Sequence, residues 1–476
     1  MSLQDPQGSE PTPPTPPTRP GTPQRGRSSF LILLAVALVA SLAANAALGV
    51  KLRHQRTTTG TLEQQIRQLN EQLDLLRSRV GGSGSTDPLG RIAAATATLR
   101  ALAFTKTVTP ELLSPAELST RVAQMFTHDN SRASLDGTAA VLATYGLLPA
   151  RYDLYGELKT LQSEQVLGFY DDKTKRMVVG AASARNPTPF LQVVLAHEYT
   201  HALADQHFGL GLLNKLQKRH EDDAAAAFLA LAEGDATFTM NLYRQEVLTA
   251  SQQQQVVQEA QSLPASAFDA APVYLKDVLQ FPYLEGLAFV TALHDSGGFD
   301  LVDQAYRDPP DSTEQIMHPS RYLDTRDAPT PVTLPDVRRA LGRGWTSIER
   351  GGVGEFDVVE LLERGGGQGL SQSEASSAAA GWDGGEYGGY RSRDGVLVAT
   401  LTAWDSDSQA REAADAFGRW LSIRYAGGSP FDAGSGRGWR SSAGAGEVVQ
   451  NGSRLLLLLG PSASDVGNAR AAFAGF

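Results

Sequence analysis

Two histidines stand four residues apart in the stretch Val194-Leu195-Ala196-His197-Glu198-Tyr199-Thr200-His201-Ala202-Leu203. On a helix, residues i and i+4 share one face, so both imidazoles can reach a single Zn²⁺. Glu198 follows the first histidine and can take a proton from a metal-bound water. With 8 His and 52 Asp+Glu in the chain, chance gives roughly 0.015 such strings. The alternative interpretation is a pair of core histidines without a metal.

A catalytic zinc site needs a third protein ligand and one open position. His207 stands six residues after His201, but the glycine of the longer HExxHxxGxxH motif is missing. The better candidate is Glu233, 32 residues after His201, in a predicted helix whose small apolar face would otherwise bury a bare carboxylate. Asp235 lies off that face and is expected to be solvated or to accept a hydrogen bond. The alternative for Glu233 is an exposed helix residue.

Two further residues are candidates for supporting roles. Asp205 comes one turn after His201 and can accept a hydrogen bond from its other ring N–H, as carboxylates near metal-bound histidines do. His318 ends a short capped turn directly before Pro319, and can stabilise the oxyanion of a tetrahedral intermediate as a second catalytic residue beside Glu198. The alternatives are an ordinary surface aspartate and a structural histidine.

With these residues in view, the chain resembles the gluzincin zinc metallopeptidases, and more narrowly an uncharacterised family of bacterial, membrane-anchored zincin-like proteins. The resemblance spans about residues 165 to 390 and rests on Gly168-Phe169-Tyr170-Asp171, Ala196 to His207, Glu233-Gly234-Asp235-Ala236, Pro309 to Pro319 and Gly381-Trp382. It implies that His197, His201 and Glu233 are zinc ligands and that Glu198 is the general base. The chain departs from well-known gluzincins at Thr237, where an aspartate often stands.

A β-hairpin is predicted just before the metal helix, from Leu167 to Val179 with a polar turn. If Met177–Val179 forms an exposed sheet edge beside the site, an extended peptide can add to it through main-chain hydrogen bonds. The alternative is a hairpin that only covers the core.

The N-terminal residues predict attachment to a membrane. Residues 1–28 form a Pro-rich tail, and the apolar run at 29–50 is long enough for a transmembrane helix; the alternative is a cleaved signal peptide. Leucines and isoleucine at heptad spacing in 57–80 indicate a coiled-coil stalk that permits a homodimer, and 81–88 is a flexible linker. The expected location is the cell membrane, with most of the chain outside the cytoplasm.

The rest of the chain divides into three segments. A mostly helical zincin-like metallopeptidase domain is predicted at 89–350, a Gly/Ser/Ala-rich linker at 351–380 and a small α+β domain at 381–476. The predicted fold class is therefore α+β: the metallopeptidase domain after a transmembrane helix and short coiled coil, followed by the small C-terminal domain.

The amino-acid composition excludes several kinds of site and argues against one class of partner. The chain of 476 residues has no cysteine, which excludes disulfides, thiolate metal sites and cysteine nucleophiles. Its net charge of −10 argues against nucleic acid as a partner. The sequence thus predicts a membrane-anchored zinc peptidase acting on peptides or proteins, and its rivals are a catalytically silent zincin-like scaffold and a metal-free helical domain. A His₂Glu site does not by itself distinguish zinc from iron, manganese or cobalt.

Overall fold

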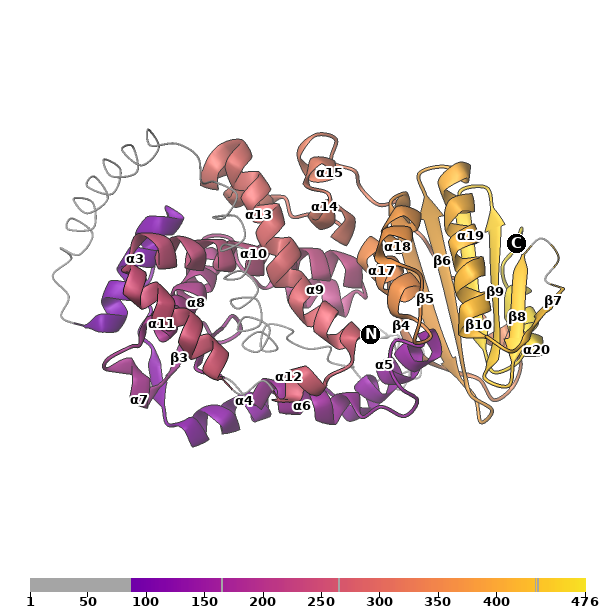
Figure 1. The fold of residues 1–476 in the computed structure, drawn as a ribbon, viewed down its shortest axis with the longest axis horizontal. Helices are drawn as coiled ribbons and strands as arrows, with labels where there is room; N and C mark the ends of the chain where they lie inside the picture. The colour runs from indigo at the N-terminus through magenta and orange to yellow at the C-terminus, as the bar shows by residue number, and fades with distance from the viewer. Residues whose placement is uncertain (1–86, 164–165, 264–265, 433, 435) are drawn as a thin grey trace, which may run out of the picture.

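The structure is a computed structural model that describes residues 87–476, except 164–165, 264–265, 433 and 435. A helical part is followed by a seven-stranded sheet with helices packed on it (Figure 1). The predicted tail, transmembrane helix and stalk lie outside the described residues. Within the described residues, no helix combines the length and the apolar character needed to cross a membrane.

The helical part runs from residue 88 to residue 341. Its helices are α3 (Pro88–Arg100), α4 (Pro115–Asp129), α5 (Arg132–Tyr145), α6 (Leu154–Ser163), α7 (Ala181–Ala184), α8 (Pro189–His207), α9 (Leu212–Lys218), α10 (Asp222–Glu246), α11 (Ala250–Ser262), α12 (Ser266–Ala270), α13 (Val273–Arg307), α14 (Thr313–Met317), α15 (Pro319–Leu323) and α16 (Arg338–Leu341). The non-helical dihedrals of Gly297 and Gly298 put a kink in α13.

Helix α8 is the centre of this part. It starts with Thr188 as N-cap and Pro189 at the first helical position. Every residue from Val193 to Asp205 is buried, because α3, α10, α11 and the strand β2 (Gly168–Asp171) pack around it. The two motif histidines therefore lie on a helix, as their spacing predicts, and in the core of the molecule.

Helices α10 and α13 cross at unusually close range because each has a glycine at the crossing point. A Cβ added at Gly234 would lie 2.1 Å from the carbonyl oxygen of Gly286, and one added at Gly286 would lie 2.1 Å from that of Ala230. No side chain fits in either place. The two backbones are therefore in direct contact, one residue after Glu233.

A three-stranded sheet lies beside α8. Its order is β1 (Glu111–Leu113), β3 (Arg176–Gly180) and β2, with β1 parallel and β2 antiparallel to β3. The predicted hairpin is confirmed as β2 and β3. Of the two alternatives for this hairpin, the exposed edge at Met177–Val179 is wrong, because β3 pairs on both sides and these three residues are buried.

The C-terminal sheet has the order β4-β5-β6-β10-β9-β8-β7, and all its pairs are antiparallel. Its strands are β4 (Thr346–Gly352), β5 (Trp382–Arg391), β6 (Val396–Trp404), β7 (Ser429–Phe431), β8 (Arg437–Ser441), β9 (Gly444–Asn451) and β10 (Arg454–Gly460), and its helices are α17 (Glu355–Arg364), α18 (Gln372–Ala379), α19 (Asp407–Arg424) and α20 (Ala463–Arg470).

Helices cover both faces of this sheet. In β10, Leu455, Leu457 and Leu459 join the core under α17, α18 and α19, whereas Leu456 and Leu458 join the core under α16 and α20. Side chains alternate between the faces of a strand, so a run of five leucines supplies both cores.

The predicted fold class needs correction. The C-terminal part is a seven-stranded antiparallel sheet that begins at Thr346, where the sequence predicts a small α+β domain starting at 381. The predicted linker at 351–380 contains α17 and α18 instead. The transmembrane helix of the predicted fold class has no support in the described residues. The Gly/Ser/Ala-rich composition of 351–380 suggested a linker, but Gly351, Gly354 and Gly369 lie so close to other atoms that a Cβ on any of them would clash.

Helix α5 belongs to the N-terminal half of the chain but packs on the C-terminal sheet. Its Val141 and Tyr145 are part of the core under α19, and the Tyr145 hydroxyl lies 2.6 Å from Thr400 Oγ1 on β6. Arg424 of α19 donates to the carbonyl oxygens of Thr144 and Tyr145 at the end of α5. The two parts are joined through this helix.

Candidate metal centre

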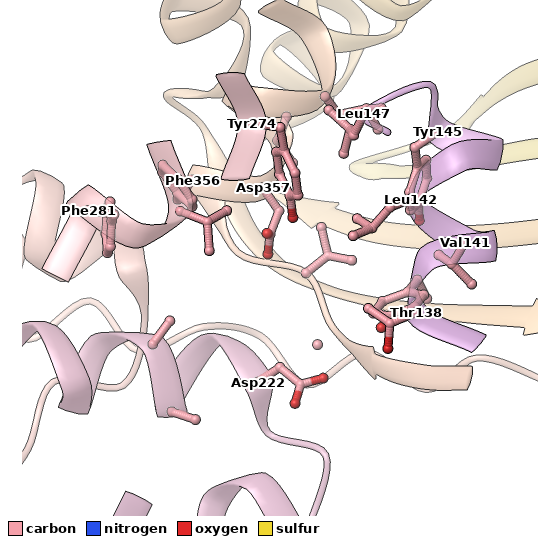
Figure 2. A pocket seen from close by; sticks show the side chains of 18 of the residues that line it. Thr138, Val141, Leu142, Tyr145, Leu147, Asp222, Tyr274, Phe281, Phe356 and Asp357 are labelled. Carbon is pink, nitrogen blue, oxygen red and sulfur yellow. The ribbon is translucent and has the colours of Figure 1, made fainter. Parts of the chain in front are cut away.

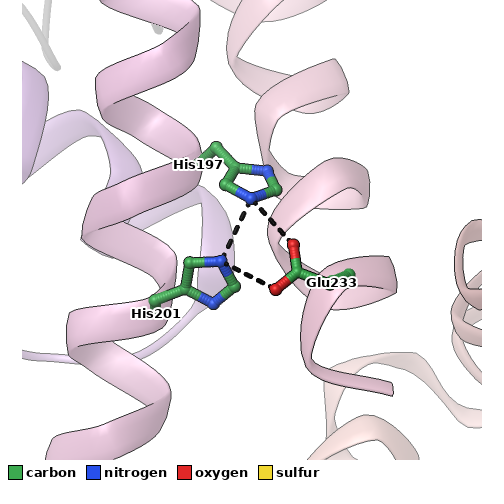
Figure 3. Close-up of side chains that lie close together, drawn as sticks. All are labelled: His197, His201 and Glu233. Carbon is green, nitrogen blue, oxygen red and sulfur yellow. Dashed lines mark hydrogen bonds and ion pairs between the residues drawn. The ribbon is translucent and has the colours of Figure 1, made fainter. Parts of the chain in front are cut away.

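Two helices bring three metal-ligating side chains together (Figure 3). His197 and His201 come from α8, and Glu233 comes from α10, which packs against it. His197 Nε2 lies 3.0 Å from His201 Nε2 and 3.1 Å from Glu233 Oε2, and His201 Nε2 lies 3.3 Å from Glu233 Oε1. All three residues are buried, so the spacing predicted from sequence becomes a compact cluster.

The geometry of this cluster fits a tetrahedral cation. A zinc ion bound at about 2.0–2.1 Å holds neighbouring donor atoms roughly 3.3 Å apart, close to the separations found here. Both histidines turn Nε2 inward, and their Nδ1 atoms have no hydrogen-bond partner among the described residues. If His201 donates a proton to the bare Nε2 of His197, that nitrogen also faces the Glu233 carboxylate, which is a second acceptor. No arrangement of protons therefore satisfies all three contacts, whereas a cation does.

The electrostatics of the cluster favour a positive charge. Burial opposes ionisation of Glu233, but the two imidazoles outweigh it and lower its pKa to about 2. Burial lowers the pKa of His201, but Glu233, Glu198 and Asp235 outweigh it and raise the value to about 9. The cluster therefore contains an ionised carboxylate and draws either a proton or a metal ion to His201 Nε2.

Glu198 lies beside the cluster but is not one of its three members. Its Oε2 accepts a hydrogen bond of 2.9 Å from the backbone N–H of Tyr170 on β2. Burial raises the pKa of Glu198, while both histidines act in the opposite direction. A buried carboxylate fixed in this way can accept a proton, which is the role expected from the sequence.

Tyr283 of α13 is a site residue that the sequence reasoning missed. Its ring stacks on that of His197, with centroids 6.1 Å apart and planes at 24°. Burial, then Glu233 and Glu198, raise the pKa of its hydroxyl, which hydrogen-bonds to Glu233. Gly234 and Gly286 were the only signal in the sequence, because the close crossing that they permit brings α13 to the ligand.

Asp235 accepts a hydrogen bond, which is one of the two environments expected for it, and it is not solvated. It is fully buried, and its Oδ1 accepts a hydrogen bond of 2.7 Å from the buried Arg100 of α3. Arg100 also pairs with Asp303 at 2.7 Å. This network fixes the turn of α10 that contains Glu233.

Asp205 contacts the hairpin and not His201. It accepts hydrogen bonds from the Tyr170 hydroxyl at 2.7 Å, Lys175 Nζ at 2.6 Å and the Leu210 N–H at 2.9 Å. Its role is therefore to hold β2 and the turn after it against α8. Since Tyr170 also donates to Glu198, Asp205 acts on the site only through that strand.

His318 is not brought to the cluster. It stands between α14 and α15, and its Nε2 lies 3.0 Å from Glu355 on α17. That hydrogen bond raises its pKa, and the other charged groups that act on it are Arg321 and Glu285. Pro319 fixes the backbone of His318. Its side chain, however, pairs with Glu355 of α17 and not with the cluster.

Comparison with known proteins identifies only the C-terminal part. A family described as a domain of unknown function (DUF8575) matches residues 343–470, which are the residues from β4 to α20. No curated protein and no solved structure matches the chain. The metal cluster and its helices lie outside the matched residues.

Proposed function

We propose that the chain is a zinc-dependent peptidase that hydrolyses peptide bonds in a peptide or protein substrate. His197, His201 and Glu233 are the ligands, and Glu198 is the general base. One observation carries the proposal: three buried donor atoms from α8 and α10 converge beside a fourth buried carboxylate that is left out of the cluster. A purely structural zinc site would use a fourth ligand and would need no base.

The residues around the cluster have separate roles in this proposal. Zn²⁺ bound there supplies Lewis acidity, which polarises a carbonyl group and lowers the pKa of water. Glu198 accepts a proton from water and delivers it to the leaving amine, and the Tyr170 N–H holds its carboxylate in one direction. Tyr283 is a positioning residue, because its hydroxyl donates to the ligand Glu233. His318 has no part in the mechanism.

The rival function is a catalytically silent zincin-like scaffold. One observation counts against turnover: the Nδ1 atoms of His197 and His201 have no hydrogen-bond partner among the described residues, whereas the acceptor that such an N–H normally finds tunes the activity of a metal site as well as its affinity. The peptidase and the scaffold both bind metal, but only the peptidase turns over a substrate. Metal analysis together with a peptide-cleavage assay therefore separates them.

The test compares three purified variants with the wild-type chain by elemental analysis and a quenched-fluorescence peptide library. Glu198→Gln is expected to keep one zinc per chain and to lose at least about 100-fold in turnover, the usual contribution of a general base. His197→Ala is expected to lose both metal and activity. Glu360→Gln is the matched control, because Glu360 is a buried glutamate of α17 outside the cluster.

The outcomes bear on different parts of the proposal. Wild-type turnover in Glu198→Gln would contradict its role as base. Stoichiometric zinc without cleavage of any library member by the wild-type chain would favour the scaffold. A wild-type chain that binds no transition metal would overturn both functions.

A further inference from the structure

A second site lies where the helical part meets the C-terminal sheet (Figure 2). Here a cavity of about 310 Å³ is lined by residues of α5, α10, α13, α17 and one face of the sheet. Its lining is mainly apolar and includes Leu142, Leu229, Leu279, Phe356, Leu455 and Leu457. None of the three cluster residues lines it, so this site is separate from the candidate metal centre.

The cavity is too large to be an ordinary packing defect. Protein interiors contain few voids larger than a water molecule, and an apolar void of ~150 Å³ already binds benzene. Small-molecule sites begin at roughly 300 Å³ and are mostly apolar with a few placed polar groups. Leu142, Val278 and Phe356 come from three different walls and are only half-buried, so they face open space that an apolar ligand can fill.

The charged groups of the lining all have one sign. Asp222 and Asp357 border the cavity, and the described lining residues include no lysine, arginine or histidine. Asp357 accepts a hydrogen bond of 2.9 Å from the Gly354 N–H. Burial raises the pKa of Asp357 to about 6, and the negative charge of Asp222 adds to that shift. A cation between the two carboxylates would offset their mutual repulsion and favour the ionised form of Asp357. An anion there would add to the repulsion and raise the pKa of Asp357 further.

We propose that this cavity binds an apolar ligand with a basic amine, whose hydrocarbon part lies among the leucines and whose ammonium group lies at Asp222 and Asp357. The preference for an amine follows from the charge of the lining, and the preference for a hydrocarbon follows from its apolar walls. This inference does not depend on the proposed peptidase activity.

The experiment measures binding of three ten-carbon probes to the full chain by isothermal titration calorimetry, below their critical micelle concentrations. The probes are decylamine, decanol and decanoate, which differ only in the charge of the polar end. Decylamine is expected to bind at least ten-fold more tightly than decanoate, with decanol between them. In Asp357→Asn, this preference is expected to fall by several-fold while decanol binding changes little.

Two variants that fill the cavity test its location. Leu142→Trp on α5 and Val278→Trp on α13 are each expected to abolish binding of all three probes. The matched control is Leu112→Trp, because Leu112 lies on β1 and is 48% exposed. Circular dichroism and the melting temperature establish that each variant is folded.

Three results would overturn the inference. The first is that no probe binds to the folded wild-type chain. The second is that both folded Trp variants bind decylamine as the wild type does. The third is that decanoate binds as tightly as decylamine.

Discussion

Asp223 is a buried carboxyl group in the first turn of α10. It accepts hydrogen bonds from the N–H and the hydroxyl of Thr313, at 3.0 and 2.6 Å, and so ties α10 to α14. Burial raises its pKa to about 7 from the ordinary value of 3.8, and the two hydrogen bonds from Thr313 oppose that shift. Its other oxygen has no hydrogen-bond partner among the described residues.

The raised pKa of Asp223 predicts that the free energy of unfolding falls as the pH rises. Between about pH 4 and pH 7 the folded chain keeps the proton that the unfolded chain releases, so the free energy of unfolding decreases as the pH rises. The loss between pH 5 and pH 8 is expected to be about 2–3 kcal/mol, at 1.36 kcal/mol per pKa unit. Asp223→Asn, which keeps an acceptor for Thr313, is expected to remove that part of the pH dependence.

Urea unfolding of wild type and Asp223→Asn at pH 5, 6, 7 and 8 measures the difference. Asp295→Asn is the matched control, because Asp295 is an exposed aspartate of α13. Parallel pH profiles for wild type and Asp223→Asn would contradict the prediction.

At the residue scale, the sequence predicted the side chains that depend on helix spacing. His197 and His201 lie one turn apart on one helix, and Glu233 was found because a bare carboxylate on an apolar helix face needs a partner. The positions of the Tyr283 and His318 side chains depend on how distant helices pack together, which the spacing of residues along one helix does not predict. Tyr283 reaches the cluster from α13, and His318 is directed to Glu355 by the packing of α17.

At the element scale, the crossing of α10 and α13 predicts that Gly234 cannot be replaced. In Gly234→Ala the new methyl group would overlap the carbonyl oxygen of Gly286, so the helices must separate. The expected cost is about 1–3 kcal/mol or more in the free energy of unfolding, measured by urea denaturation. Because Glu233 precedes Gly234 and Tyr283 contacts it from α13, affinity for added zinc is expected to fall as well.

Gly467→Ala is the control for this substitution. Gly467 lies inside α20, and a Cβ added there would meet no atom within 4 Å. Alanine is therefore expected to stabilise that helix by about 0.4–1 kcal/mol through the unfolded state. A Gly234→Ala protein as stable as the wild type would show that the two helices can move apart at little cost.

The sequence predicted elements with strong side-chain periodicity and missed those built from glycine. The periodicity predicts helices at 222–240, 409–425 and 463–473 and strands at 396–404 and 454–459. The observed α10, α19, α20, β6 and β10 lie close to these ranges. Strand β5 was missed because Gly384, Gly385, Gly388 and Gly389 give it no side-chain alternation. Their absent side chains leave room for the backbone of Thr330 and the side chain of Leu334, which come from a distant segment.

At the scale of the whole molecule, the contact between α5 and the sheet predicts that the two parts unfold together. All five tryptophans lie between residues 345 and 439, so their fluorescence reports on the C-terminal part, while ellipticity at 222 nm reports mainly on the helices. In the wild type, the two signals are expected to give the same urea midpoint.

A double variant tests this coupling. Tyr145→Phe with Arg424→Ala removes the hydroxyl contact to Thr400 and the hydrogen bonds to the end of α5. The two midpoints are then expected to separate by roughly 0.5 M urea. Arg411→Ala, an exposed position on the same helix α19, is the control. Coincident midpoints in the double variant would show that other contacts are sufficient to couple the parts.

The position of α5 also has a consequence for synthesis of the protein. Tyr145 and its partner Thr400 are separated by 255 residues, which a ribosome adds in roughly 10–50 s at 5–20 residues per second. During that interval the apolar side of α5 has left the exit tunnel while the sheet that will cover it does not yet exist. The nascent chain therefore presents this helix to chaperones, and a pause in translation before Thr400 would lengthen that exposure.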